Sequence, residues 1–215
     1  MGVTVTWLGH ASFRIAGSAI IYIDPWKIAD EPKDGDVILV SHPHQDHWSR
    51  KDIEKVSRHG APLIGPPDVV ESADEGSLLA PGGVIEAGGA RITGWPAYNL
   101  RKPFHPRKKN WLGYIVELDG VSVYYAGDTD RIPEMADLEG IDLALLPAGG
   151  TFTMNPKKAA EAAGDIGALA SLPYHWGTIV GSASDAESFA QIVGDRAIVL
   201  AKGDSTDIEP PGDFA

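Results

Sequence analysis

The sequence of 215 residues predicts an α/β fold in which helices cover β-sheets. Three observations support this prediction. Short apolar segments with strand patterns fill the first part of the chain, strand and helix patterns alternate in the second part, and 43% of the residues are apolar, which is enough for a sizeable core. We expect one domain spanning residues 1–215, or two closely packed halves within it.

The first predicted elements are strands. Residues 3–23 alternate between apolar and polar positions, which predicts a β-meander that ends at Asp24. The apolar run 37–40 is typical of a strand that is buried on both faces, and it leads directly to His42. Ser49 and Asp52 then resemble a capping box, which predicts a helix that stops at Gly60.

The rest of the chain continues with strands and then alternates. Further strands are predicted at 91–95, 113–118 and 121–126, the last two joined by the turn Asp119-Gly120. The remaining predicted elements are a strand at 143–146, a helix at 155–166, a strand at 169–173, a helix opened by Ser184 with Glu187, and a strand at 197–201. The tail after Asp204 is rich in Pro, Gly and acidic residues, so we expect it to be loosely held.

Composition excludes several kinds of function. The formal net charge of −12 argues against broad binding to nucleic acid or to anionic membranes. The chain has no cysteine, so any metal must be held by His and carboxylate side chains. No apolar stretch reaches about 18 residues and no signal-like segment opens the chain, so a cytoplasmic location is expected. The sequence is compatible with a homo-oligomer.

The densest group of metal-ligand side chains is His42-Pro43-His44-Gln45-Asp46-His47. In an extended chain, the imidazoles of His42 and His44 project to the same side and can bind one ion. Asp46 and His47 are expected at the start of a helix, where neighbouring side chains diverge by about 100° and suit a second ion. Hydrolytic ions need several protein ligands and an open position, so further ligands must come from elsewhere.

Three distant residues are the candidates for those further ligands. His105, Asp128 and His175 each lie at the end of a predicted strand or in the loop beyond it, where sites in α/β proteins tend to form. His10 also lies after a strand, and the sequence leaves open whether it lines the pocket or packs near the turn. Glu134 could either reach the site or favour the start of a helix.

These residues resemble the metallo-β-lactamase superfamily, whose mark is His-x-His-x-Asp-His after a buried strand. Asp24-Pro25, Gly127-Asp128-Thr129 and Tyr174-His175-Trp176 match the surrounding motifs in the right order. The opening segment 7–13 is similar to a branch that contains uncharacterised metal-dependent hydrolases, ascorbate-phosphate lactonases and N-acyl-phosphatidylethanolamine phospholipases. The resemblance implies a four-layer αβ/βα sandwich with a dinuclear site at the mouth between two sheets.

The resemblance also implies a ligand set for two divalent ions. His42, His44 and His105 would hold one ion, Asp46, His47 and His175 the other, and Asp128 would bridge them. His105 departs from the family pattern because it comes several residues after its strand rather than soon after it. Asp24 would support a ligand from behind, by fixing the backbone or a histidine tautomer. Zn is the expected metal, and Mn, Fe and Ni are alternatives because availability often decides.

The expected activity is hydrolysis of a small anionic ester, lactone or phosphodiester. Two divalent ions, two carboxylates and a hydroxide leave a formal charge of about +1 at the centre, which would attract an anionic substrate. Coordination brings the pKa of water near 7, and Asp46 would orient that nucleophile and relay its proton. Lys102 and Lys109, in a basic segment around His105, could bind a phosphate or carboxylate, and Trp176 could wall the pocket.

The basic segment and the aromatic side chains each have an alternative interpretation in which they play no part in a site. Basic segments are often solvated loops, and large aromatic side chains more often fill the core than line a site. At the level of the whole protein, a nuclease of the same superfamily and a metal-dependent sensor or binding protein without catalytic activity are the rival functions. The acidic balance of the chain argues against a nuclease.

Overall fold

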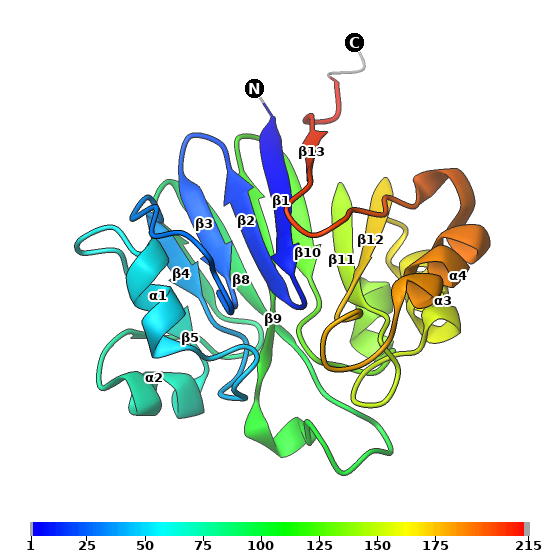
Figure 1. Cartoon of the computed structure of the whole chain (residues 1–215), viewed down its shortest axis with the longest axis horizontal. Helices are drawn as coiled ribbons and strands as arrows, with labels where there is room; N and C mark the ends of the chain where they lie inside the picture. Colours follow the sequence, from blue (N-terminus) through cyan, green and yellow to red (C-terminus); the bar gives the residue numbers. More distant parts are fainter. Residues whose placement is uncertain (1, 213–215) are drawn as a thin grey trace.

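Two β-sheets face each other in the computed structural model, which describes residues 2–212, and helices cover both outer sides (Figure 1). The first sheet has the strand order β13-β1-β2-β3-β4-β5-β6 and the second has the order β12-β11-β10-β9-β8-β7. The strands of the first sheet are β1 (Val3–Gly9), β2 (Ser12–Ala16), β3 (Ile20–Ile23), β4 (Val37–Leu39), β5 (Leu63–Gly65), β6 (Ser77–Leu78) and β13 (Ser205–Ile208). Those of the second sheet are β7 (Val84–Ala87), β8 (Ala90–Pro96), β9 (Leu112–Leu118), β10 (Val121–Tyr125), β11 (Leu143–Pro147) and β12 (Ala170–Tyr174).

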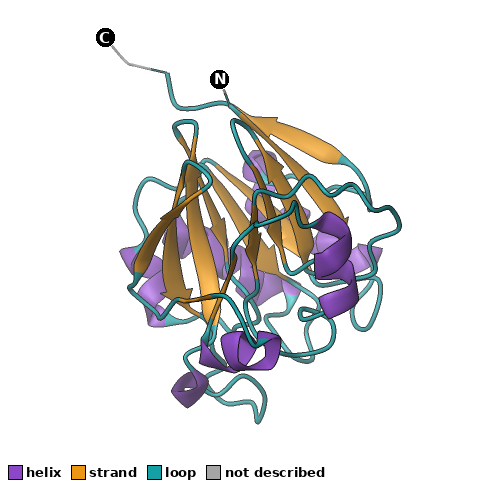
Figure 2. Ribbon diagram, turned by 90° about the vertical axis from the view of Figure 1, so that its left-hand side faces the viewer, coloured by secondary structure: helices purple, strands orange, loops and turns teal. Residues whose placement is uncertain are grey.

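Three apolar clusters define four layers. Between the sheets, Phe13 of β2 and Tyr114 of β9 belong to one large buried cluster. A second cluster joins the outer face of the first sheet to α1 (Arg50–Val56) and α2 (Pro67–Ala73). A third joins the outer face of the second sheet to α3 (Pro156–Ile166) and α4 (Ala183–Val193), so the sheets lie between layers of helix (Figure 2). The predicted four-layer αβ/βα sandwich is confirmed.

The meander and the hairpin form as the sequence indicates. Along β1, buried and half-buried side chains alternate, because a strand with one face on the core points successive side chains to opposite sides. β4 is buried throughout, as expected of a short parallel strand between β3 and β5. Asp119 and Gly120 both have positive φ, 52° and 79°, which is the backbone that a tight hairpin between β9 and β10 requires.

Helix termini follow the capping rules, with two shifts in position. Ser49 accepts a hydrogen bond from the amide of Asp52 and starts α1, but the helix ends at Val56 rather than at Gly60. The predicted start of α4 at Ser184 with Glu187 is wrong by two residues. Its capping box is formed by Ser182 and Asp185, which have the same spacing.

Two predictions near the C-terminal end are wrong. Residues 197–201 form no strand, because only Ala197 makes a bridge, to Ser171, and the chain then crosses toward the first sheet. The tail after Asp204 is not loosely held throughout, since Ser205–Ile208 form β13 and pair with β1. There the Thr4 hydroxyl donates to the Asp207 carboxylate at 2.6 Å. The Pro-rich composition begins only after this strand, and residues 213–215 lie outside the described range.

Additional 3-10 turns span Arg107–Lys109, Pro133–Asp137 and Gly194–Arg196. Within residues 2–212, no helix is both long enough and apolar enough to cross a membrane.

Candidate metal centre

The candidate residues meet because each lies beyond the carboxyl end of a strand. His10 follows β1, Asp24 follows β3, His42 follows β4, Asp128 follows β10 and His175 follows β12. His105 lies further from its strand, β8. Asp46 and His47 are in a hydrogen-bonded turn before α1, and not in a helix as the sequence suggested, because the amides of His47 and Trp48 both donate to the carbonyl of His44.

One group of potential ligands consists of His42, His44 and His105. Nε2 of His42 is 3.0 Å from Nδ1 of His44, and Nε2 of His105 is 3.2 Å from the same atom. One ligand atom of each residue lies within 4.8 Å of the others, so the three side chains could hold one ion. His42 and His105 are buried, whereas His44 is exposed, so this group faces the outside through His44.

A second group consists of Asp46, His47 and His175, together with His10. Oδ2 of Asp46 lies 3.7 Å from Nε2 of His47 and 3.8 Å from Nε2 of His175. His10 approaches the same carboxylate oxygen at 2.9 Å. The ligand atoms of all four residues lie within 4.8 Å of one another, so this group could hold a second ion.

Asp128 lies between the two groups, with one oxygen facing each. Its Oδ2 is 3.3 Å from Nε2 of His105 and 4.0 Å from Nε2 of His42. Its Oδ1 is 3.2 Å from Nε2 of His175 and 3.4 Å from Nε2 of His47. A carboxylate placed in this way has the geometry to bridge two ions.

Buried polar atoms without partners point to a cation at this place. Within the part of the chain that the structure describes, Nε2 of His47, Nε2 of His175 and Oδ1 of Asp128 are buried and make no hydrogen bond. Leaving such atoms without a partner costs about 1–3 kcal/mol each. Two nitrogen lone pairs and a carboxylate oxygen facing one another form a donor set that suits a divalent ion, so the residues fit the expected metal.

Asp24 fixes the cluster from behind. Its fully buried carboxylate lies 2.6 Å from Nδ1 of His47 and accepts hydrogen bonds from the amide of Ser41 at 2.7 Å and from the hydroxyl of Tyr125 at 2.6 Å. The Ser41 hydroxyl also donates to it at 2.5 Å and lies 2.9 Å from Nδ1 of His42. Because Asp24 engages Nδ1 of His47, Nε2 of that ring is directed at Asp128.

Burial keeps most of the histidines in their neutral form. It lowers the pKa of His42 well below the ordinary value, lowers those of His10 and His44, and lowers that of His105 to about 4. A neutral imidazole has a free lone pair at pH 7, which metal binding requires.

The charged members of the site are stabilised by one another. Burial opposes protonation of His47, but Asp128 and Asp24 raise its pKa well above the ordinary value. Burial likewise opposes ionisation of Asp128, but His175 and His47 hold its pKa well below the ordinary value. For Asp46, burial opposes ionisation, but the hydrogen bond from His10 and the charge of His47 together lower the pKa to about 2. A proton and a divalent ion would compete for Nε2 of His47, because both need its lone pair.

Asn99 explains how His105 reaches the site from a loop that departs from the family pattern. Its amide N–H donates to the carbonyl of His105 at 2.8 Å and closes the loop. Its side-chain Nδ2 donates to the carbonyls of Phe104 at 3.0 Å and Phe152 at 2.8 Å, and lies 3.1 Å from Nδ1 of His105. Asn99 therefore joins the His105 loop to the loop after β11 and fixes the ring of His105.

Replacing Asn99 with Ala is expected to lower kcat by roughly 10- to 100-fold, because the loop that presents His105 loses its anchor. The variant should remain folded, since the change removes contacts between loops and not core. Steady-state kinetics and the metal content of the purified protein measure the effect. Asn110→Gly is the control, because Asn110 has a φ of 52° that Gly adopts freely and lies outside these contacts. Equal activity of the two variants would contradict the role of Asn99.

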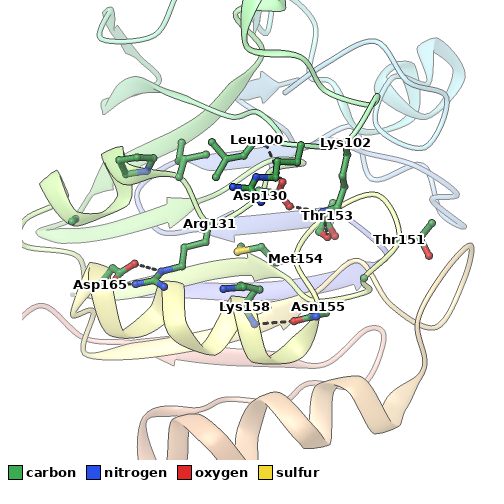
Figure 3. A pocket seen from close by; sticks show the side chains of 15 residues that line it. Leu100, Lys102, Asp130, Arg131, Thr151, Thr153, Met154, Asn155, Lys158 and Asp165 are labelled. Carbon is green, nitrogen blue, oxygen red and sulfur yellow. Dashed lines mark hydrogen bonds and ion pairs between the residues drawn. The ribbon is translucent and has the colours of Figure 1, made fainter.

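Lys102 and Lys109, the two basic side chains expected to bind substrate, have partners within the protein. The amine of Lys102 bonds to Asp130 and to the carbonyl of Thr153, and it lines a cavity of about 1050 Å³ between loops and α3 (Figure 3). None of the histidines lines this cavity. Lys109 is bonded at 2.9 Å to Asp68 at the start of α2.

Trp176 and Glu134, two further candidates from the sequence, both contact other side chains. Trp176 packs against Trp7 in a tilted arrangement with ring centroids 4.7 Å apart, and its indole N–H donates to the carbonyl of Pro173. Glu134 accepts hydrogen bonds from the Tyr98 hydroxyl at 2.9 Å and from Arg107 at 2.8 Å, so its contacts are with these two side chains.

Sequence reasoning missed the residues that orient the ligands. Ser41 and Tyr125 border the motifs directly, one before His42 and the other at the end of the strand that leads to Asp128. Each is a polar residue at the end of an otherwise apolar strand, and this pattern is the signal that could have identified both. Asn99 had a signal too, since it is a polar residue in the loop that follows the strand before His105.

Known proteins resemble this chain over most of its length. A family model for the Beta-lactamase superfamily domain matches residues 4–175. A UPF0173 metal-dependent hydrolase from Thermococcus onnurineus is 37% identical over 92% of this chain and 95% of its own.

Solved structures share this fold. A candidate metal-dependent hydrolase from Parabacteroides distasonis superposes with a TM-score of 0.83 at 32% identity, covering 92% of each chain. A metallo hydrolase from Ignicoccus hospitalis gives 0.82 at 25% identity, covering 97% of this chain and 99% of that one. These similarities agree with the cluster of histidine and aspartate side chains. They show that the chain belongs to the β-lactamase superfamily and, within it, to the UPF0173 metal-dependent hydrolase family.

Proposed function

We propose that this protein is a hydrolase that uses two divalent ions to cleave a small anionic ester, lactone or phosphodiester. The observation that supports two ions best is the placement of Asp128, whose oxygens face different histidine groups at 3.2–3.4 Å. The names of the relatives support hydrolysis as the reaction class.

Each residue of the site would have its own role. His42, His44 and His105 would hold one ion, Asp46, His47 and His175 the other, and Asp128 would bridge them. Bound there, divalent ions supply a water whose pKa is near 7 and a positive charge that stabilises the oxygen under attack. Asp46 turns Oδ2 toward His47 and His175, which leaves Oδ1 to orient the water and accept its proton.

The site would recognise the negative charge of its substrate and would accept a small molecule. Lys102 and Lys109 remain the proposed contacts for an anionic group, and Trp176 remains the proposed wall of the pocket. Lys102 would exchange Asp130 for the anionic group. The partner is a small molecule, not nucleic acid or membrane, because the chain is strongly acidic. A homo-oligomer remains compatible with this proposal. The narrower resemblance to ascorbate-phosphate lactonases remains a prediction, as do Zn as the metal and a cytoplasmic location.

Metal analysis of the purified protein, followed by an activity screen, tests the proposal. The screen compares phosphodiesters, lactones and carboxylic esters with RNA and single-stranded DNA, using His47→Ala as the control. We expect about two ions per chain and turnover of a small substrate that His47→Ala abolishes. Activity that survives this substitution refutes the mechanism. Cleavage of nucleic acid alone would favour a nuclease, and tight metal binding without any turnover would favour a sensor.

A further inference from the structure

His10 is built into the centre although the ligand sets above do not use it. It forms the turn between β1 and β2, with a φ of 51°, and it directly follows Gly9, whose φ is 107°. A non-glycine residue held in this region costs on the order of 1–3 kcal/mol, and such strain concentrates at functional sites. The side chain is 1% exposed, so the protein buries a strained histidine at its metal centre.

The backbone of His10 fixes the last ligand of the chain. Its carbonyl accepts hydrogen bonds from the amide of His175 and from the indole N–H of Trp7, both at 3.0 Å. The rings of His10 and His175 also pack with centroids 4.0 Å apart. The turn after β1 therefore determines where the loop after β12 places His175.

The side chain of His10 fixes Asp46. Its Nε2 lies 2.9 Å from Oδ2 of Asp46. A carboxylate only accepts hydrogen bonds, so the nitrogen bears the proton and donates it. Consistent with that tautomer, Nδ1 of His10 has no hydrogen-bond partner among residues 2–212.

The spacing of the atoms fits a hydrogen bond between His10 and Asp46. The distances from Asp46 Oδ2 to His47 and His175 are 3.7 and 3.8 Å, long enough to admit an ion. The 2.9 Å separation between His10 and Asp46 is shorter and fits a direct N–H···O bond.

We propose that His10 is a positioning residue that aligns Asp46 and His175 for the second ion. Its N–H occupies one lone pair of Asp46 Oδ2 and leaves the other for the metal. The orientation of the carboxylate then directs Oδ1 away from the histidines and toward the nucleophile. This inference rests on the proposed assignment of Asp46, His47 and His175 to one ion.

Two substitutions of similar size test the hydrogen bond. His10→Gln retains an N–H donor, whereas His10→Met does not. Zn²⁺ binding to the metal-free proteins is measured by calorimetry. We expect His10→Met to weaken binding of one equivalent by roughly 10- to 100-fold and His10→Gln to remain within about threefold of the original chain. Trp7→Phe is the control, because it removes a bond to the His10 carbonyl and keeps the imidazole.

The visible spectrum of bound Co²⁺ separates positioning from ligation. At saturating Co²⁺, a positioning role predicts nearly the same ligand-field bands in His10→Met and in the original chain. A changed coordination spectrum would overturn the proposal in favour of direct ligation, and equal Zn²⁺ affinity in the Met and Gln variants would overturn it altogether. Metal binding is read without any substrate, so failure of the hydrolase proposal shows up separately, as absent turnover in a protein that binds its ions normally.

Discussion

Asp128→Asn is expected to lower hydrolytic activity by roughly 10³-fold or more, equivalent to about 4 kcal/mol of transition-state stabilisation. The substitution preserves the shape of the side chain and removes its charge. It also replaces one of the two oxygens that face the histidine groups with an NH₂ group, which donates hydrogen bonds and cannot bind a cation. One ion would lose this ligand, and the other would keep only a neutral amide oxygen in place of a carboxylate. Steady-state kinetics with the substrate from the activity screen, together with metal content, measure the loss.

Asp142→Asn is the matched control for this prediction. Asp142 is also a buried aspartate that follows a turn, and it accepts a hydrogen bond from the amide of Ser122 at 2.7 Å, next to the start of β11 and away from the histidines. We expect the control to lose about 1 kcal/mol of stability and to keep its activity within about threefold. If Asp128→Asn retains two ions and most of its activity, Asp128 is not the bridge.

The sequence was sufficient to predict the parts of the site that are local in the chain. His42, His44, Asp46 and His47 lie close together after a buried strand, and a short continuous apolar run identifies that strand. Asp128 and His175 were found for the same reason, because each directly follows a strand whose carboxyl end reaches the same edge.

The parts that depend on contacts between distant segments could not be predicted in this way. His105 was named as a candidate, but its anchoring by Asn99 and by the loop that contains Phe152 was not predicted, because no periodic pattern encodes a closed loop. β13 was missed because its partner, β1, lies about 200 residues earlier and a short polar strand has no signal of its own. The role of His10 was undecided because it depends on Asp46, whose side chain meets it only in the folded chain.

Asp24→Ala is expected to destabilise the metal-free protein by about 3–5 kcal/mol, the cost of leaving buried polar partners of a lost carboxylate unpaired. Ser41, His47 and Tyr125 all contact this fully buried carboxylate. Urea unfolding measures the loss, and the metal-free protein is used because ions bound to the folded state would add stability of their own. Asp34→Ala is the comparison, since Asp34 has partners in Arg14 and Tyr22 but is 28% exposed, and about 1 kcal/mol is expected there.

Asp24→Asn then separates support of the fold from support of the metal. An asparagine can still accept the hydrogen bond from the Ser41 amide, so more of the stability should survive than in Asp24→Ala. It cannot supply the negative charge beside Nδ1 of His47, whose proton keeps Nε2 free for a cation. We therefore expect Zn²⁺ affinity to fall roughly 10- to 100-fold in a variant that still folds. Unchanged affinity would mean that Asp24 stabilises the loop before His42 and does not orient His47.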